Sequence, residues 1–150
     1  MATQLKDFRN ALAAVAGDSF RSETNAKIGV ALEGLALREF KESRDPYGKD
    51  WKPVGRLSKR LSRGRSGPRR RGAPLVKTGA LRASHVSSGS ADGVRIGFAD
   101  PVAIFHQKGT PTIDKRQILP EATTGGLPPA WLAEIQRVHA ACVRRRLRAA

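Results

Sequence analysis

The sequence predicts an α+β protein with an N-terminal helix or helices, a small antiparallel β-sheet, a C-terminal helix and a long basic loop. Apolar residues recur at helical spacing near both ends, two short strand-like runs lie between them, and an arginine-rich stretch precedes the runs. A length of 150 residues fits a single domain over residues 1–150. Within it we expect a mobile basic loop at about residues 56–74 and a basic C-terminal tail at about residues 144–150.

Helical spacing dominates the first 42 residues. A first segment, with Leu5, Phe8, Leu12 and Val15, is interrupted at Gly17-Asp18, and whether it merges with the next helix stays open. The second helix is predicted over residues 22–42, and its apolar face consists of Ile28, Leu32, Leu35, Ala36, Leu37 and Phe40. Asp45-Pro46-Tyr47-Gly48 then ends the helix, because proline restricts the residue before it and glycine permits a turn.

The second half supplies the strands and the last helix. Runs at residues 85–88 and 94–98, joined by a Gly-Ser-Ala-Asp-Gly connection, predict a β-hairpin. Residues 102–106 fit either a third strand or one helical turn, and residues 118–120 could begin another strand. Pro128-Pro129 suits the start of a helix, whose buried stripe is predicted to contain Trp131, Ile135, Val138 and Cys142, with Leu147 near its end. The single cysteine excludes an internal disulfide, and we expect it to act as a small buried hydrophobic residue.

Positive charge is concentrated in two places. The formal net charge is +15, and residues 55–82 and the stretch after Glu134 contain fifteen of the 28 basic residues and no acid. Such clusters favour phosphate backbones or acidic protein surfaces. The candidate contact residues are Arg63, Arg65, Arg69, Arg70, Arg71, Arg144, Arg145 and Arg146. Two interpretations stay open: arms that become ordered on a protein partner, or direct contact with DNA.

Patterns typical of an enzyme are missing from the sequence. His85, His106 and His139 lack metal-ligand spacing, and the acidic residues form no Asp-x-Asp or Glu-x-Glu pair. We therefore predict no catalytic, cofactor-binding or metal-binding residues, and a structural hydrogen-bonding role for His106.

Four short motifs, in a fixed order along the chain, are similar to those of a known protein family. They are Gly48-x-x-Trp51-x-Pro53, Thr78-Gly79-x-Leu81-Arg82-x-Ser84, Gly93-Val94-x-Ile96-Gly97 and an apolar segment ending in His106-Gln107-x-Gly109. This order resembles the phage virion morphogenesis (tail-completion) family of Mu-like and related phages. The chain departs from the family at Val102, where tyrosine is frequent, and at residues 114–119, where the usual Pro-Ala-Arg-Pro-Phe-Leu reads Asp-Lys-Arg-Gln-Ile-Leu.

The resemblance implies a structural virion protein that forms a ring at the head–tail neck and joins head to tail around the DNA channel. It implies a stopper, tail-terminator or tail-completion role, a choice that stays open, and a hexamer as the oligomer. Expected partners are further copies of the chain, neighbouring neck, portal-side or tail-tube proteins and phage DNA, but no membrane. The expected location is the virion neck or upper tail, with the host cytoplasm during assembly. The alternative is a basic nucleic-acid-binding protein without catalytic activity.

The motif residues are expected to be structural. Gly97 and Gly109 would allow a close backbone approach or a positive φ, and Tyr47 and Trp51 would be anchors in the core or in a subunit contact. The full set is Gly48, Trp51, Pro53, Thr78, Gly79, Leu81, Arg82, Gly97, His106, Gln107 and Gly109.

Overall fold

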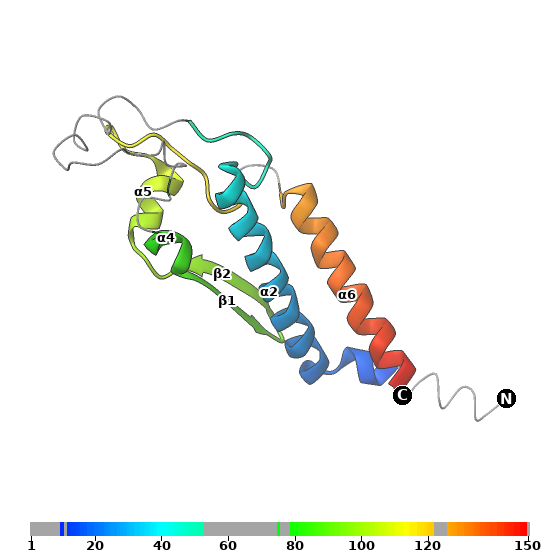
Figure 1. Cartoon of the computed structure of the whole chain (residues 1–150). Coiled ribbons are helices and arrows are strands. Elements are labelled where there is room, and N and C mark those ends of the chain that lie inside the picture. The colour runs from blue at the N-terminus through cyan, green and yellow to red at the C-terminus, as the bar shows by residue number, and fades with distance from the viewer. Residues whose placement is uncertain (1–9, 11, 53–74, 76–78, 122–125, 150) are drawn as a thin grey trace. The chain divides into compact units, whose positions relative to one another are not determined.

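The computed structural model describes residues 10, 12–52, 75, 79–121 and 126–149 (Figure 1). Its elements are, in chain order, α2 (Asp18–Glu42), α4 (Ala80–Ala83), β1 (His85–Ser90), β2 (Gly93–Phe98), α5 (Val102–Lys108) and α6 (Pro129–Ala149). Helices that precede and follow a two-stranded antiparallel sheet in the chain confirm the predicted α+β class. The predicted basic loop, residues 56–74, lies outside the described residues.

The chain divides into two compact units. One consists of Met1–Leu35, Val86–Gly97 and Leu127–Ala150, and the other of Ala36–His85 and Phe98–Gly126. Helix α2 continues from the first unit into the second. The expectation of a single domain stays a prediction.

Helix α2 begins at Asp18, four residues earlier than predicted, and Gly17 separates it from the helical residues 12–16. The buried positions of α2 recur mainly at every fourth residue: Phe20, Thr24, Ile28, Leu32, Ala36 and Phe40. Since a turn takes 3.6 residues, this stripe winds slowly around the helix. The prediction missed Phe20 and Thr24, and it wrongly included Leu37, which is 37% exposed.

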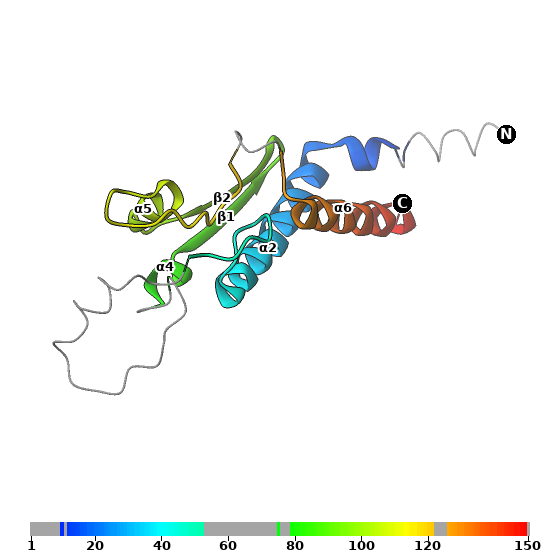
Figure 2. The ribbon, with the colours of Figure 1, turned by 90° about the horizontal axis from the view of Figure 1, so that it is seen from above.

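In the first unit, the hairpin β1–β2 packs on α2 (Figure 2). A Cβ atom at Gly29 would lie 3.4 Å from the Ser87 side chain and 3.5 Å from that of Val94. The Asn25 side chain donates a hydrogen bond to the carbonyl oxygen of Ser90, at 2.6 Å. Both strands are longer than predicted, and only Ala91-Asp92 forms the turn. Gly89 therefore belongs to β1, where its missing side chain lets the strand approach the α2 backbone.

Helix α6 also belongs to the first unit and begins at Pro129, as predicted. The carbonyl oxygen of Pro128 accepts a hydrogen bond from the Leu132 amide, at 2.9 Å. Trp131, Val138 and Cys142 are buried, as predicted for the stripe and for the apolar role of the cysteine, whereas the fourth predicted residue, Ile135, is only partly buried. Leu147 is 46% exposed, so the stripe ends at Cys142. The basic residues from position 144 lie in this helix, not in a separate tail.

The second unit has a core of Phe40, Trp51, Leu81 and Ile118, with Leu75, Phe98 and Ala103 packed against it. The rings of Phe40 and Trp51 meet edge to face, with their centroids 5.3 Å apart. Residues 102–106 belong to the helix α5, so the strand alternative was wrong. Residues 118–120 form no strand either, because side chains bind this segment in place of a neighbouring strand.

Candidate functional site

The first motif begins with a tight turn at Asp45. The Asp45 carboxylate accepts hydrogen bonds from the backbone amides of Tyr47 (2.9 Å) and Lys49 (2.8 Å). Gly48 has a φ of 86°, a value that glycine adopts without strain, and its amide donates to the carbonyl oxygen of Asp45. The Tyr47 hydroxyl donates to the carbonyl oxygen of Gly126, at 3.0 Å. This turn reverses the chain so that Trp51 points back into the core.

Trp51 anchors the motif. Its side chain is 7% exposed, and its indole nitrogen donates a hydrogen bond to the carbonyl oxygen of Gln117, at 2.9 Å. A buried tryptophan normally finds such an acceptor, because its N–H group is costly to leave unpaired. Of the two expected roles, core and subunit contact, the structure assigns Trp51 to the core. Pro53 lies outside the described residues.

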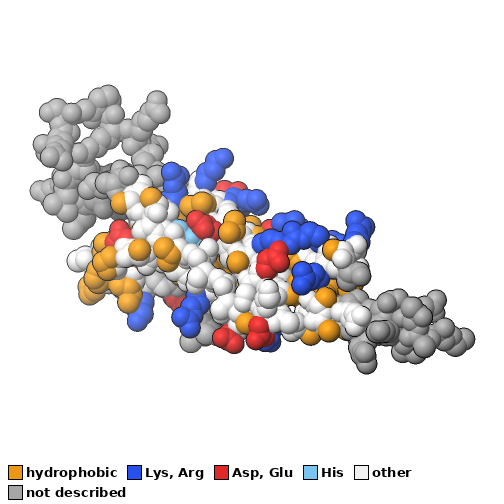
Figure 3. All heavy atoms as spheres, turned by 90° about the horizontal axis from the view of Figure 1, so that it is seen from below, with side chains coloured by type: hydrophobic (Ala, Val, Ile, Leu, Met, Phe, Trp, Pro, Cys, Tyr) orange, Lys and Arg blue, Asp and Glu red, His pale blue; other side chains and the backbone are white. Residues whose placement is uncertain are grey.

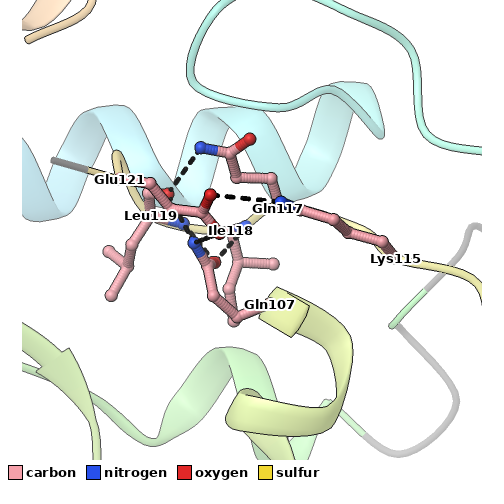
Figure 4. A network of polar contacts seen from close by, with 6 residues as sticks. All are labelled: Gln107, Lys115, Gln117, Ile118, Leu119 and Glu121. Atoms are coloured by element: carbon pink, nitrogen blue, oxygen red, sulfur yellow. Dashed lines mark hydrogen bonds and ion pairs between the residues drawn. The ribbon is translucent and has the colours of Figure 1, made fainter. Parts of the chain in front are cut away.

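The fourth motif supplies Gln107, whose side-chain amide binds the extended segment 118–121 (Figure 4). Its oxygen accepts hydrogen bonds from the amides of Ile118 (2.8 Å) and Leu119 (3.0 Å). Its nitrogen donates to the carbonyl oxygen of Leu119 (2.9 Å) and to the Glu121 carboxylate (3.0 Å). One side chain thus provides the partners that a neighbouring strand would otherwise provide, and it fixes Ile118 in the core. We call this arrangement the Gln107 clamp.

Gly109 allows the chain to return toward this segment. Its φ is 77°, and an added Cβ atom would lie 3.1 Å from both the backbone nitrogen and the Cβ of Lys115. Lys115 forms an ion pair with Glu121 at 3.1 Å. Gly109 therefore meets both expectations, a positive φ and a close approach.

The remaining motif positions have more limited roles. Gly79, with a φ of 76°, precedes α4, a short helix that the sequence did not predict, and Leu81 of α4 is buried in the core. Arg82 is exposed, and Thr78 lies outside the described residues. Gly97 has no positive φ, and an added Cβ atom would meet only the Val86 side chain, at 3.9 Å. The backbone reason expected for a glycine is thus present at Gly109 and absent at Gly97.

A sequence profile of the phage virion morphogenesis family matches residues 2–134. The chain belongs to this family. The match includes all four motifs, the Gln107 clamp and the first residues of α6. The protein therefore takes part in the morphogenesis of a phage virion. No curated protein and no solved structure matches the chain.

In this virion morphogenesis protein, Arg116 is a structural residue that the sequence reasoning missed. It is 7% exposed, and its guanidinium donates to the carbonyl oxygens of Lys52 (3.2 Å) and, at a longer 3.4 Å, Asp114. Residues 114–119 depart from the family pattern as a whole, but Arg116 matches the third position of Pro-Ala-Arg-Pro-Phe-Leu. That retained arginine was the signal that could have identified it.

His106 has a smaller role than expected. Its carbonyl oxygen accepts a hydrogen bond from the Arg116 amide at 2.8 Å, but its Nδ1 is buried and meets no hydrogen-bond partner in the described part of the chain. Burial lowers the pKa of His106, the charge of Arg116 lowers it further, and Asp100 opposes both. The side-chain hydrogen bonding predicted for His106 belongs to the neighbouring Gln107.

The structure describes only three of the eight basic residues predicted to contact DNA or a partner. Arg63, Arg65, Arg69, Arg70 and Arg71 lie outside the described residues. Arg145 forms an ion pair with Glu23 of α2 at 2.5 Å, so its charge is partly used within the first unit. Arg144 and Arg146 are exposed on the last turns of α6 and form no ion pair with any residue that the structure describes.

Metal-binding clusters and membrane-spanning helices are both missing from the described ranges. No group of three or more His, Cys, Asp or Glu residues there is placed to hold a metal ion. None of the helices in these ranges combines the length and the apolar character that crossing a membrane requires.

Proposed function

We propose that this protein forms a homo-oligomeric ring, a hexamer, at the neck of a tailed phage, where it joins the head to the tail around the DNA channel. Family membership over residues 2–134 is the observation that carries this proposal. Its partners are further copies of the chain, the neighbouring neck or tail proteins and the DNA in the channel.

The small sheet supports an oligomer. Strands β1 and β2 form a two-stranded sheet, and no other strand among the described residues pairs with either edge. Open edges on a small sheet favour association, and a closed ring is one way of covering them.

The charge distribution supports a position beside DNA or acidic protein. Arg144, Arg146 and Arg148 are exposed on the last turns of α6, and Arg144 and Arg148 lie one turn apart. Basic side chains that the fold does not pair remain available for phosphates or carboxylates.

Removing the gene tests this function. We expect non-infectious lysates that contain separate heads and tails, and purified protein should restore their joining. Heads that lose DNA would indicate a stopper, and tails of irregular length would indicate a terminator. In purified wild-type virions, mass spectrometry should detect the chain, and averaged images of the neck should contain it as a closed ring.

Two outcomes would contradict the proposal. One is a deletion phage with normal, infectious particles. The other is a protein that is absent from purified virions but binds duplex DNA tightly, which would favour the alternative of a basic nucleic-acid-binding protein.

A further inference from the structure

An apolar ridge protrudes from the second unit on helix α5. Val102, Ile104 and Phe105 are 43%, 50% and 49% exposed. Ala103, between them in the sequence, packs against the core, so the three larger side chains lie on the outer side of the helix. Figure 3 shows this group of hydrophobic side chains at the lower left of the face drawn there. A single exposed apolar residue is ordinary, but three on one short helix indicate a contact surface.

A hollow of about 240 Å³ lies on the hairpin of the first unit. Since Ser87 and Gly89 face α2, strand alternation puts Val86, Ser88, Arg95 and Gly97 on the opposite face, and these four residues line the hollow together with Ser87 and Ile96. Val86 is 51% exposed. The missing side chain of Gly97 leaves space beside Val86 in this hollow.

Charges beside the ridge and the hollow are complementary. Asp100 lies just before α5 and Lys108 at its end, whereas Arg95 lies beside the hollow and Asp92 in the hairpin turn. None of these four residues forms an ion pair within the described chain. Asp100 and Lys108 are eight positions apart, mostly along α5, which is about 12 Å at the helical rise, and Asp92 and Arg95 are three positions apart at the start of β2, about 10 Å at the strand rise. The two pairs therefore have opposite charges at similar spacing.

We propose that the α5 ridge of one copy docks into the hairpin hollow of the next copy. Phe105 fills the space beside Gly97, Asp100 pairs with Arg95, and Lys108 pairs with Asp92 of the neighbour. The inference rests on the proposed ring and names its subunit contact. It also gives Gly97 a role that its backbone conformation does not explain.

Each copy has one ridge and one hollow, so a head-to-tail arrangement repeats the same contact from copy to copy. Such a heterologous contact generates a ring when the rotation closes. An aromatic side chain that is buried in a pocket of its partner is also typical of the residues that dominate binding energy.

Two substitutions test the contact: Gly97→Val alters the hollow, and Phe105→Ser alters the ridge. The introduced valine side chain would fill the hollow without backbone strain, because φ is not positive and the Cβ contact is ordinary. We expect wild type to form a ring by native mass spectrometry and sedimentation at about 0.15 M salt, where charge repulsion is screened beyond about 8 Å. Each variant should keep its melting temperature and weaken self-association by about tenfold or more. Leu132→Ser, a similarly exposed position on α6, should leave the ring intact.

Mixing the two variants is the sharpest measurement. The Gly97→Val chain keeps its ridge and the Phe105→Ser chain keeps its hollow, so one good contact remains, and the mixture should stop at a one-to-one dimer. Lys108→Asp should weaken the ring, and adding Asp92→Lys should restore it.

The inference is overturned by a wild-type chain that stays monomeric, or by folded Gly97→Val and Phe105→Ser variants that still form rings. In the second case the ring uses another surface and the neck function is untouched. Conversely, rings that respond as expected, from a protein absent from virions, would refute the neck function and leave this contact standing.

Discussion

Gly89 of β1 lies directly against the backbone of Ala26 in α2. A Cβ atom at Gly89 would lie 2.2 Å from the amide nitrogen of Ala26 and 2.4 Å from the carbonyl carbon of Asn25. Real Cβ atoms essentially never approach backbone so closely. Strand and helix can therefore meet here only because position 89 has no side chain.

Gly89→Ala should lower the free energy of unfolding by about 3 kcal/mol, the upper part of the range for overpacking, because the helix backbone cannot move aside cheaply. Urea denaturation measures this loss. Gly34→Ala is the matched control: nothing lies within 4 Å of its added Cβ, and alanine favours the helix by about 0.5–1 kcal/mol. Equal stability of the two variants would contradict the close approach.

Gln107→Glu should destabilise the protein more at neutral than at acidic pH. The glutamate keeps the accepting oxygen but has a second acceptor oxygen where the amide nitrogen donates to Leu119 and Glu121, and this oxygen faces the Glu121 carboxylate, which now lies 3.0 Å from the amide nitrogen. Loss of satisfied buried hydrogen bonds costs about 1–3 kcal/mol. The difference from wild type, followed by urea denaturation, should shrink as the pH approaches the carboxyl range. Gln117→Ala, which removes one 3.2 Å side-chain hydrogen bond to the same carbonyl oxygen, should cost less.

Short-range sequence patterns were enough to predict the two long helices, α2 and α6. The repeat through Ile28, Leu32, Ala36 and Phe40 predicted most of α2, and Pro129 marked the start of α6, because apolar period and proline geometry act within one helix. Gly89 was assigned to a turn, since glycine weakens isolated strands, and only its contact with α2 explains its place in β1.

The candidate site depended more on contacts between distant segments. Ile118 was predicted to begin a strand, but its amide pairs with the Gln107 side chain, eleven residues away in the sequence. The motif marked His106 and Gln107 equally, and no local pattern distinguishes a half-buried imidazole from an amide with four partners. The exposed residues of α5 were missed for the same reason, because the four apolar residues that begin this short helix do not reveal that Ala103 is the one that packs on the core.

His106 should make stability fall as the pH is lowered. Burial and Arg116 lower the pKa of the folded imidazole, so the unfolded state, with an ordinary pKa of about 6.5, takes up its proton first. The unfolding free energy should therefore decrease below about pH 6.5 and level off once the folded imidazole is also protonated. His106→Asn should flatten this dependence, measured as urea midpoints between about pH 7.5 and 5. His85 and His139 are present in both proteins, so an unchanged pH dependence would show that His106 does not cause it.

The exposed arginines of α6 should contribute to binding far more than to folding. Replacing Arg144, Arg146 and Arg148 with Gln removes cations near a helix C-terminus, which costs only about 0.3–1 kcal/mol for each favourable interaction with the helix dipole. If these residues bind DNA, the slope of log affinity against log salt should fall by about 0.9 for each phosphate that the variant no longer neutralises. If they bind a neck protein instead, the variant should fail to join heads to tails, and the wild-type protein itself should bind duplex DNA only weakly.

A charge-matched control separates the position of these arginines from the total charge. The control replaces three exposed basic residues elsewhere with Gln: Arg38, Lys41 and Lys49. We expect this control to join heads to tails as the wild type does and to show the same slope of log affinity for DNA against log salt. The α6 variant should be defective in at least one of these two measurements. Equal behaviour of the two variants would mean that only net charge matters, because both lose three positive charges from the same chain.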